Sequence, residues 1–203
     1  ENLALMRISS NHKIQGNTVI LQHGMTQPTL WNRPDAVYLS SIFRWNRQKV
    51  LLCSQSFPCE VWVGGTGIDA AISLPDEIAA CLPDYDLYNK RRAIGFITRG
   101  CVRSCPWCIV PIKEGKLRFV SNFQDILGEF QQAILLDNNF LALDRPLLLE
   151  QLQQIIDSGA AVDFNQGLDV RLIDDEVAHH LGQVRWLAGP RLAMDGEHQI
   201  KPF

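Results

Sequence analysis

Short apolar runs alternate with helix-forming patterns along the second half of the chain, and this alternation constrains the fold more than any other feature. The pattern predicts strands over residues 92–98, 133–137, 161–164 and 184–187, and helices over residues 122–132, 145–158 and 174–181. Gly159 and Gly182 are expected to end the last two helices. Such alternation predicts a parallel sheet with right-handed crossovers, either open or curling toward a barrel.

The first 75 residues show a second α/β pattern. Asn2 can cap a helix that runs to about Gly16, and strands are expected over residues 18–22, 36–41 and 60–63. This is the pattern of an open sheet that lacks its first strand, the one expected before Asn2. Residues 74–89 have the character of a connector with a short helix over 76–81. We therefore expect a fragment of a longer protein.

Polar residues follow three successive expected strands of the second half. Cys101 follows the first strand, Asp137-Asn138-Asn139 the second, and the segment 166–171 the third. Functional residues of parallel α/β sheets lie at the carboxyl ends of the strands. The three clusters are therefore expected at one edge of the sheet.

Charge and composition exclude several classes of protein. The 203 residues are 46% hydrophobic and carry a net charge of −3, which argues against a disordered chain and against a protein that coats nucleic acid. The basic residues at 90–92 and at Lys113, Lys116 and Arg118 are interpreted as solvated surface, with anion contacts as the alternative. Neither a membrane span nor a signal peptide is visible, so we expect a cytoplasmic protein without a membrane partner.

Three of the six cysteines lie close together in a C-x3-C-x2-C spacing, at Cys101, Cys105 and Cys108. Thiolates in such a loop favour a soft-metal centre of zinc, copper(I) or iron and sulfur. Closed zinc sites and ordinary four-iron clusters take four ligands, so three cysteines leave one coordination site open for chemistry. The alternatives are a zinc site completed by Cys81, His179 or His180, and a loop of unligated thiols.

The segment from Gly100 to Cys108 resembles the cluster-binding loop of the radical S-adenosylmethionine (radical SAM) superfamily, in which an aromatic residue precedes the third cysteine. The rest of the chain resembles a radical enzyme group whose amino-terminal part is similar to a cobalamin-binding domain. That resemblance runs through residues 2–16, 64–69, 74–77, 83–85, 99–101, 113–115, 136–140 and 166–171.

The resemblance implies a four-iron, four-sulfur (4Fe-4S) cluster held by Cys101, Cys105 and Cys108, with S-adenosylmethionine on the unique iron. The reduced cluster would cleave S-adenosylmethionine to a 5′-deoxyadenosyl radical that abstracts a hydrogen atom from a substrate. An electron donor such as flavodoxin or ferredoxin is implied as a partner. The substrate, small molecule or macromolecule, is not indicated.

The resemblance also implies roles in binding S-adenosylmethionine. Trp107 would lie against the adenine, with ordinary packing as the alternative. Many family members have Gly-Gly-Glu where this chain has Asp137, Asn138 and Asn139, whose oxygens can still accept hydrogen bonds from the methionine amino group. Asp169 and Arg171 could hold the ribose hydroxyls or the methionine carboxylate, and the alternative is a structural salt bridge.

The expected fold is therefore α/β in two domains. Residues 1–90 would form a flavodoxin- or Rossmann-like, cobalamin-binding-like domain and connector, incomplete at its amino terminus. Residues 91–203 would form a radical SAM core, a partial (β/α) TIM-like barrel incomplete at its carboxyl terminus.

Two further observations bear on ligands. The Asp-x-His-x-x-Gly pattern of many cobalamin domains is absent, which argues against bound cobalamin, and the glycines at 64–67 favour a tight turn over a phosphate site. The rival hypothesis is a non-catalytic zinc or iron–sulfur module that binds a partner, such as RNA, through the basic clusters.

Overall fold

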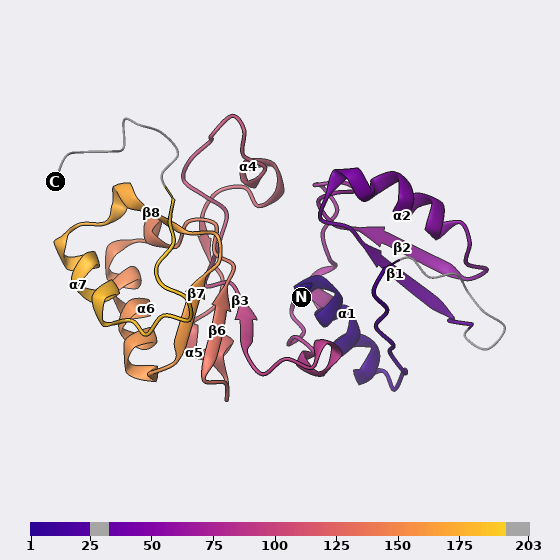
Figure 1. Cartoon of the computed structure of the whole chain (residues 1–203), viewed down its shortest axis with the longest axis horizontal. Helices are drawn as coiled ribbons and strands as arrows, with labels where there is room; N and C mark the ends of the chain where they lie inside the picture. Colours follow the sequence, from indigo (N-terminus) through magenta and orange to yellow (C-terminus); the bar gives the residue numbers. More distant parts are fainter. Residues whose placement is uncertain (25–32, 194–203) are drawn as a thin grey trace. The chain divides into compact units, whose positions relative to one another are not determined.

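The chain forms two compact units, Glu1–Lys90 and Arg91–Phe203, each a mixed α/β structure with small parallel sheets (Figure 1). The computed structural model describes residues 1–24 and 33–193. Among these residues no closed barrel is present. None of the helices within the same ranges has the length and apolar character needed to cross a bilayer.

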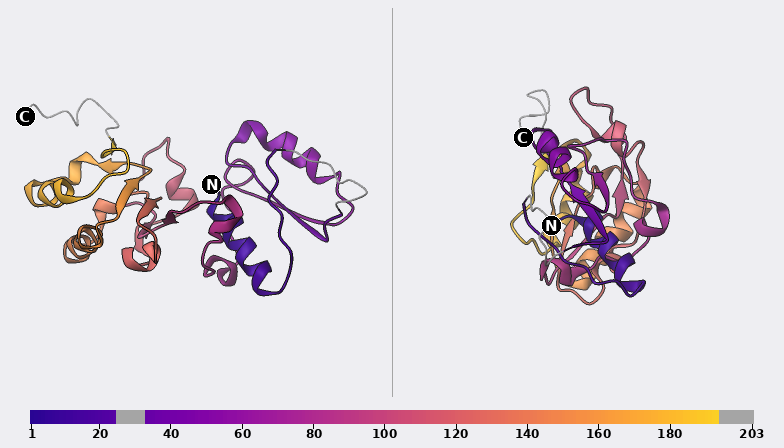
Figure 2. Two further views of the ribbon diagram at one scale, coloured as in Figure 1. Left: turned by 60° about the horizontal axis from the view of Figure 1, so that its bottom comes forward. Right: turned by 90° about the vertical axis from the view of Figure 1, so that its right-hand side faces the viewer.

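The first unit is built around two parallel strands, β1 (Ala36–Ser40) and β2 (Glu60–Gly64) (Figure 1, Figure 2). Helix α1 (Leu3–Ile14) begins as expected at Asn2, whose side chain accepts a hydrogen bond from the Leu5 amide at 3.2 Å. The unit also contains η1 (Arg44–Asn46), α2 (Arg47–Ser54), α3 (Asp76–Ala79) and η2 (Tyr85–Tyr88).

Two expectations for the first unit are corrected or sharpened. Residues 18–22 form no strand, and Ile20 is 67% exposed. The glycine segment does form a tight turn. Gly65 has φ +96°, a Cβ there would overlap the Ser41 carbonyl, and the Gly67 amide donates to that same carbonyl at 2.9 Å.

The second unit contains a parallel sheet whose strand order follows the chain: β3 (Ala93–Gly95), β6 (Gln132–Leu135) and β7 (Ala161–Phe164). Three helices cover one face of it (Figure 1): α5 (Phe123–Leu127), α6 (Arg145–Ser158) and α7 (Asp175–Gln183). Alternate strand residues, such as Ala133, Leu135, Val162 and Phe164, form the core with these helices.

Short elements complete the second unit at the carboxyl ends of the strands. They are β4 (Thr98–Arg99), α4 (Val110–Lys113), β5 (Arg118–Phe119), η3 (Phe140–Ala142), β8 (Leu168–Asp169), η4 (Val170–Leu172) and β9 (Leu192–Ala193). β4 pairs antiparallel with β5, and β8 pairs parallel with β9.

Several expected boundaries in the second unit were wrong. The helix expected over 122–132 ends at Leu127, because Gly128 takes φ +53°. Helix α7 continues through Gly182, which has no positive φ. Residues 184–187 form only an isolated parallel bridge, between Val162 and Trp186, rather than a strand. The run at 92–98 is divided between β3 and β4.

Candidate functional site

The three clustered cysteines lie on residues 100–117, which we call the cysteine loop. β4 and β5 close its base, and Arg99 forms a two-pronged ion pair with Glu114, with Nε–Oε2 and Nη2–Oε1 distances of 2.7 and 2.9 Å. Gly100 has φ +82°, and a Cβ there would overlap the Lys116 carbonyl oxygen. The loop can therefore leave β4 only through a glycine.

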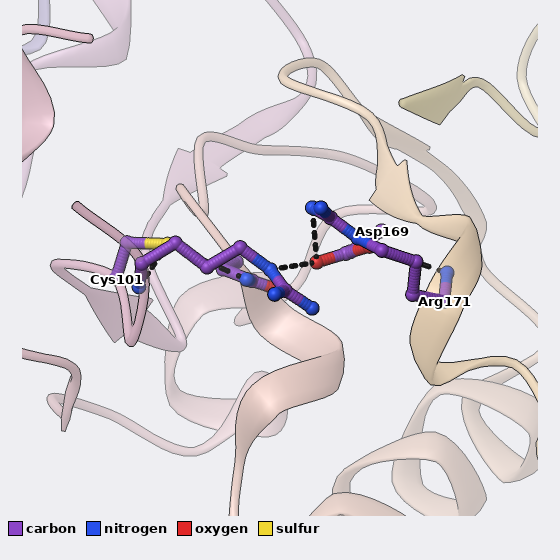
Figure 3. Close-up of polar contacts among 5 residues, drawn as sticks. Cys101, Asp169 and Arg171 are labelled. Atoms are coloured by element: carbon purple, nitrogen blue, oxygen red, sulfur yellow. Dashed lines mark hydrogen bonds and ion pairs between the residues drawn. The ribbon is translucent and has the colours of Figure 1, made fainter. Parts of the chain in front are cut away.

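Cys101 is the cysteine that is most closely connected to the sheet. Its sulfur accepts hydrogen bonds from the Arg103 amide at 3.3 Å and from Asn139 Nδ2 at 3.4 Å (Figure 3). Its own amide donates to the Gly115 carbonyl at 3.3 Å. These two N–H groups fix the position of the Cys101 sulfur beside the end of β6.

Cys105 and Cys108 make their contacts within the loop. The Cys108 amide donates to the Cys105 carbonyl at 3.0 Å, and the Cys108 sulfur accepts from the Val110 amide at 3.4 Å. All three cysteines are free and partly buried. Within residues 1–24 and 33–193, no three His, Cys, Asp or Glu side chains are gathered as a metal-binding group.

Asp137 points to the base of the cysteine loop rather than into it. Its buried carboxylate accepts hydrogen bonds from the amides of Ile97 and Thr98, at 3.3 and 2.5 Å, and from Thr98 Oγ1 at 2.7 Å. Burial raises the pKa of Asp137 to about 6, although the hydrogen bonds from Thr98 act in the opposite direction. Asp137 therefore joins β6 to β4.

The two asparagines after Asp137 reach the loop itself. Asn138 Oδ1 accepts from the Gly100 amide at 3.0 Å, while Asn139 Nδ2 donates to Cys101. Asn139 is 5% exposed, and its Oδ1 atom is buried without a hydrogen-bond partner among the described residues. A buried acceptor without a donor is costly, so this atom is suited to a donor supplied by a ligand.

Asp169 lies between two arginines (Figure 3). Arg171 contacts both carboxylate oxygens, with Nε–Oδ1 and Nη2–Oδ2 distances of 2.6 and 3.0 Å, and Arg103 Nε lies 2.7 Å from Oδ2. Burial would raise the pKa of Asp169, but hydrogen bonds from Arg171 and Arg103 outweigh it and hold that pKa below its ordinary value. Asp169 and Arg171 thus form a salt bridge with each other.

Trp107 is 72% exposed on the cysteine loop, so it is not packed in a core as its alternative interpretation required. The candidates for a fourth zinc ligand belong to elements other than the cysteine loop. Cys81 belongs to the first unit, and His179 and His180 lie on α7 of the second. His180 Nδ1 lies 2.8 Å from the Glu176 carbonyl oxygen of its own helix.

The expected meeting of three polar clusters at one edge of the sheet is confirmed. Asn138 and Asn139 contact Gly100 and Cys101 from the end of β6, and Asp169 contacts Arg103 from β8, after β7. Sequence reasoning missed Arg103 and Thr98. Arg103 could have been found as a charged residue between two cysteines that needs a counter-charge.

The residue types at this edge are those that a soft-metal centre uses, although the described residues do not gather the three cysteine side chains as a metal-binding group. Three thiols on one loop supply soft donors, and the unpartnered Asn139 Oδ1 supplies an acceptor beside Cys101. No protein-family model and no curated protein sequence matches the chain.

Proposed function

We propose that this chain is a radical SAM protein whose Cys101, Cys105 and Cys108 hold a 4Fe-4S cluster. The observation that carries the proposal is the contact of the cysteine loop with Asn138, Asn139 and Asp169 at the carboxyl edge of the sheet. Parallel α/β sheets bind their ligands at this edge.

The bound cluster would supply one electron to break the sulfonium of S-adenosylmethionine, which gives a 5′-deoxyadenosyl radical able to abstract a substrate hydrogen. Asn139 Oδ1 accepts from the methionine ammonium, while Nδ2 of the same side chain holds Cys101. Trp107 lies against the adenine. Arg171, fixed by Asp169, meets the methionine carboxylate or the ribose.

We also propose that the second unit has a partial (β/α) TIM-like barrel fold. The sequential order of β3, β6 and β7 and the parallel bridge from Val162 to Trp186 support this proposal. The parallel pair β1 and β2 with α2 supports a flavodoxin- or Rossmann-like arrangement for the first unit. A cytoplasmic flavodoxin or ferredoxin would serve as the electron donor.

Anaerobic reconstitution with iron and sulfide tests the cluster. A brown protein with about four irons per chain is expected, with a reduced-state electron spin resonance signal that S-adenosylmethionine perturbs. Dithionite-reduced protein should release 5′-deoxyadenosine. Cys101→Ala, Cys105→Ala and Cys108→Ala should each abolish this release, whereas Cys59→Ala in the first unit should keep the cluster.

A colourless protein that retains one zinc per chain would overturn the proposal and favour the zinc module. The same variants distinguish a metal that stabilises the fold from a metal that takes part in the chemistry. If Cys101→Ala unfolds the second unit rather than silencing a folded protein, the metal supports the fold instead of the chemistry.

A further inference from the structure

The two ends of the cysteine loop are held in different ways. The Cys101 end contacts the end of β6 through Asn138 and Asn139, and it contacts β8 through Arg103 and Asp169. By contrast, the contacts of the other two cysteines stay within the loop: the Cys108 amide donates to the Cys105 carbonyl, and the Cys108 sulfur accepts from the Val110 amide.

The Arg103–Asp169 contact reaches furthest from the loop. Arg103 Nε lies 2.7 Å from Asp169 Oδ2, and the side chain of Asp169 is only 7% exposed. Asp169 is itself held by Arg171, and its Oδ1 also accepts from the Arg171 amide at 3.2 Å. The Asp169 carboxylate is therefore fixed in position by Arg171. The cysteine loop contributes the other partner of the ion pair, Arg103, whose side chain is 33% exposed.

The backbone of Arg103 connects this anchor directly to a cysteine. Its amide donates to Cys101 Sγ at 3.3 Å, so the same residue bonds the sulfur through its main chain and Asp169 through its side chain (Figure 3). Because Arg103 makes both contacts, moving Cys101 away from the sheet edge would break the charge-assisted hydrogen bond from Arg103 to Asp169.

We propose that Arg103 and Asp169 form a latch that fixes the Cys101 end of the cysteine loop on β8 before any cluster is bound. Arg103 is thus a positioning residue that acts through Cys101, and Cys101 is the preordered ligand of the three. The identity of the cluster rests on the proposed function, whereas the latch is a property of the metal-free chain.

Hydrogen exchange of the metal-free protein tests the latch. In Arg103→Gln, exchange at the Cys101 amide should rise roughly tenfold or more, the loss expected for one hydrogen bond to a charged group. Exchange at β6 and α6 should not change. Arg103→Lys should give an intermediate rate, because it keeps the positive charge but loses the guanidinium Nε that donates to Asp169.

The matched control is Arg145→Gln, which removes another arginine that pairs with carboxylates, Asp174 and Glu176, away from the cysteine loop. It should leave exchange at Cys101 at the wild-type rate. Unchanged exchange at Cys101 in a folded Arg103→Gln, or an equal rise across β6, would overturn the latch.

Iron content, measured in parallel, separates the two proposals. Reconstituted Arg103→Gln should lose iron to a chelator faster than wild type if both hold. If wild type forms no cluster but Arg103→Gln still frees the Cys101 amide, the latch stands and the proposed function falls. If the cluster forms in wild type but Arg103→Gln leaves exchange at the Cys101 amide unchanged, the proposed function stands and the latch falls.

Discussion

The carboxylate of Asp137 accepts two hydrogen bonds from Thr98, one from its amide at 2.5 Å and one from its hydroxyl at 2.7 Å. Asp137 follows β6 and Thr98 opens β4, so this contact joins the central strand to the base of the cysteine loop. Asp137 is 3% exposed, and burial raises the pKa of its carboxyl from 3.8 to about 6.

We predict that stability depends on pH through Asp137. Its raised pKa means that the folded state retains a proton that the unfolded state releases, so the contribution is full below pH 3.8 and is lost as pH rises through about 6. Two pKa units correspond to about 3 kcal/mol. Asp137→Asn does not titrate, so the free energy of unfolding of wild type minus variant should fall between pH 4 and 7 by up to about 3 kcal/mol. Urea denaturation at several pH values measures it, and a constant difference would contradict the prediction.

Gly100 and Gly115 make a matched pair in the cysteine loop. Both have positive φ, +82° and +72°, but a Cβ at Gly100 overlaps the Lys116 carbonyl while a Cβ at Gly115 meets nothing within 4 Å. Gly115→Ala should therefore cost only the conformational strain, about 1 kcal/mol. Gly100→Ala should cost more than that and release the Gly100 bond to Asn138, visible as faster exchange at that amide. Equal unfolding free energies for the two variants would contradict the prediction, because they would show that the loop backbone moves to accommodate the Cβ at residue 100 without cost.

The main strands and the long helix could be predicted because their signals are local. Residues 145–158 carry a helical pattern ended by a glycine, and α6 has those bounds. Residues 18–22 have an equally strand-like composition but form no strand. Composition does not reveal whether a second strand lies in register beside such a segment.

In the candidate site, too, local features could be predicted from the sequence and contacts between distant residues could not. The cysteine spacing and the carboxyl-edge rule predicted which segments meet. The direction of each side chain depended on partners far away in the chain: Asp137 reaches Thr98, and Asp169 reaches Arg103. These partners lie 39 and 66 residues apart, beyond any local pattern.

The corrected end of α7 leads to a stabilising substitution. Gly182 lies inside this helix with open space around a Cβ, so Gly182→Ala should raise the free energy of unfolding by about 0.5–1 kcal/mol. Gly159 after α6 is the contrasting control. It has φ +63°, so Gly159→Ala should lower stability by about 1 kcal/mol. Thermal denaturation distinguishes the two, and a destabilised Gly182→Ala would contradict the assignment.

In the first unit, Asp84 should support stability at neutral pH. It accepts from Ser9 Oγ at 2.5 Å and pairs with Lys13 Nζ at 2.7 Å, both on α1. Burial would raise the pKa of Asp84, but the hydrogen bonds from Lys13 and Ser9 bring it below 3.8. Its contribution is therefore present above pH 3.8 and is lost as pH falls through the lowered pKa. Asp84→Asn should cost about 1 kcal/mol at pH 7 and less near pH 3, measured by exchange of the α1 amides, with the exposed Asp157→Asn as control.

Asn139 allows the two proposed roles of one side chain to be separated. Asn139→Leu removes the Oδ1 acceptor and the Nδ2 donor, so S-adenosylmethionine should bind the reconstituted protein roughly tenfold more weakly. Asn139→Asp keeps an acceptor for the methionine ammonium but replaces the donor to Cys101 with a negative charge. We therefore expect near wild-type affinity but a lower reduction potential of the cluster, because negative charge near the cluster disfavours an added electron. Equilibrium dialysis and redox titration measure the two effects. Loss of affinity in both variants would show that Oδ1 is not the acceptor, and wild-type affinity in Asn139→Leu would place the ammonium elsewhere.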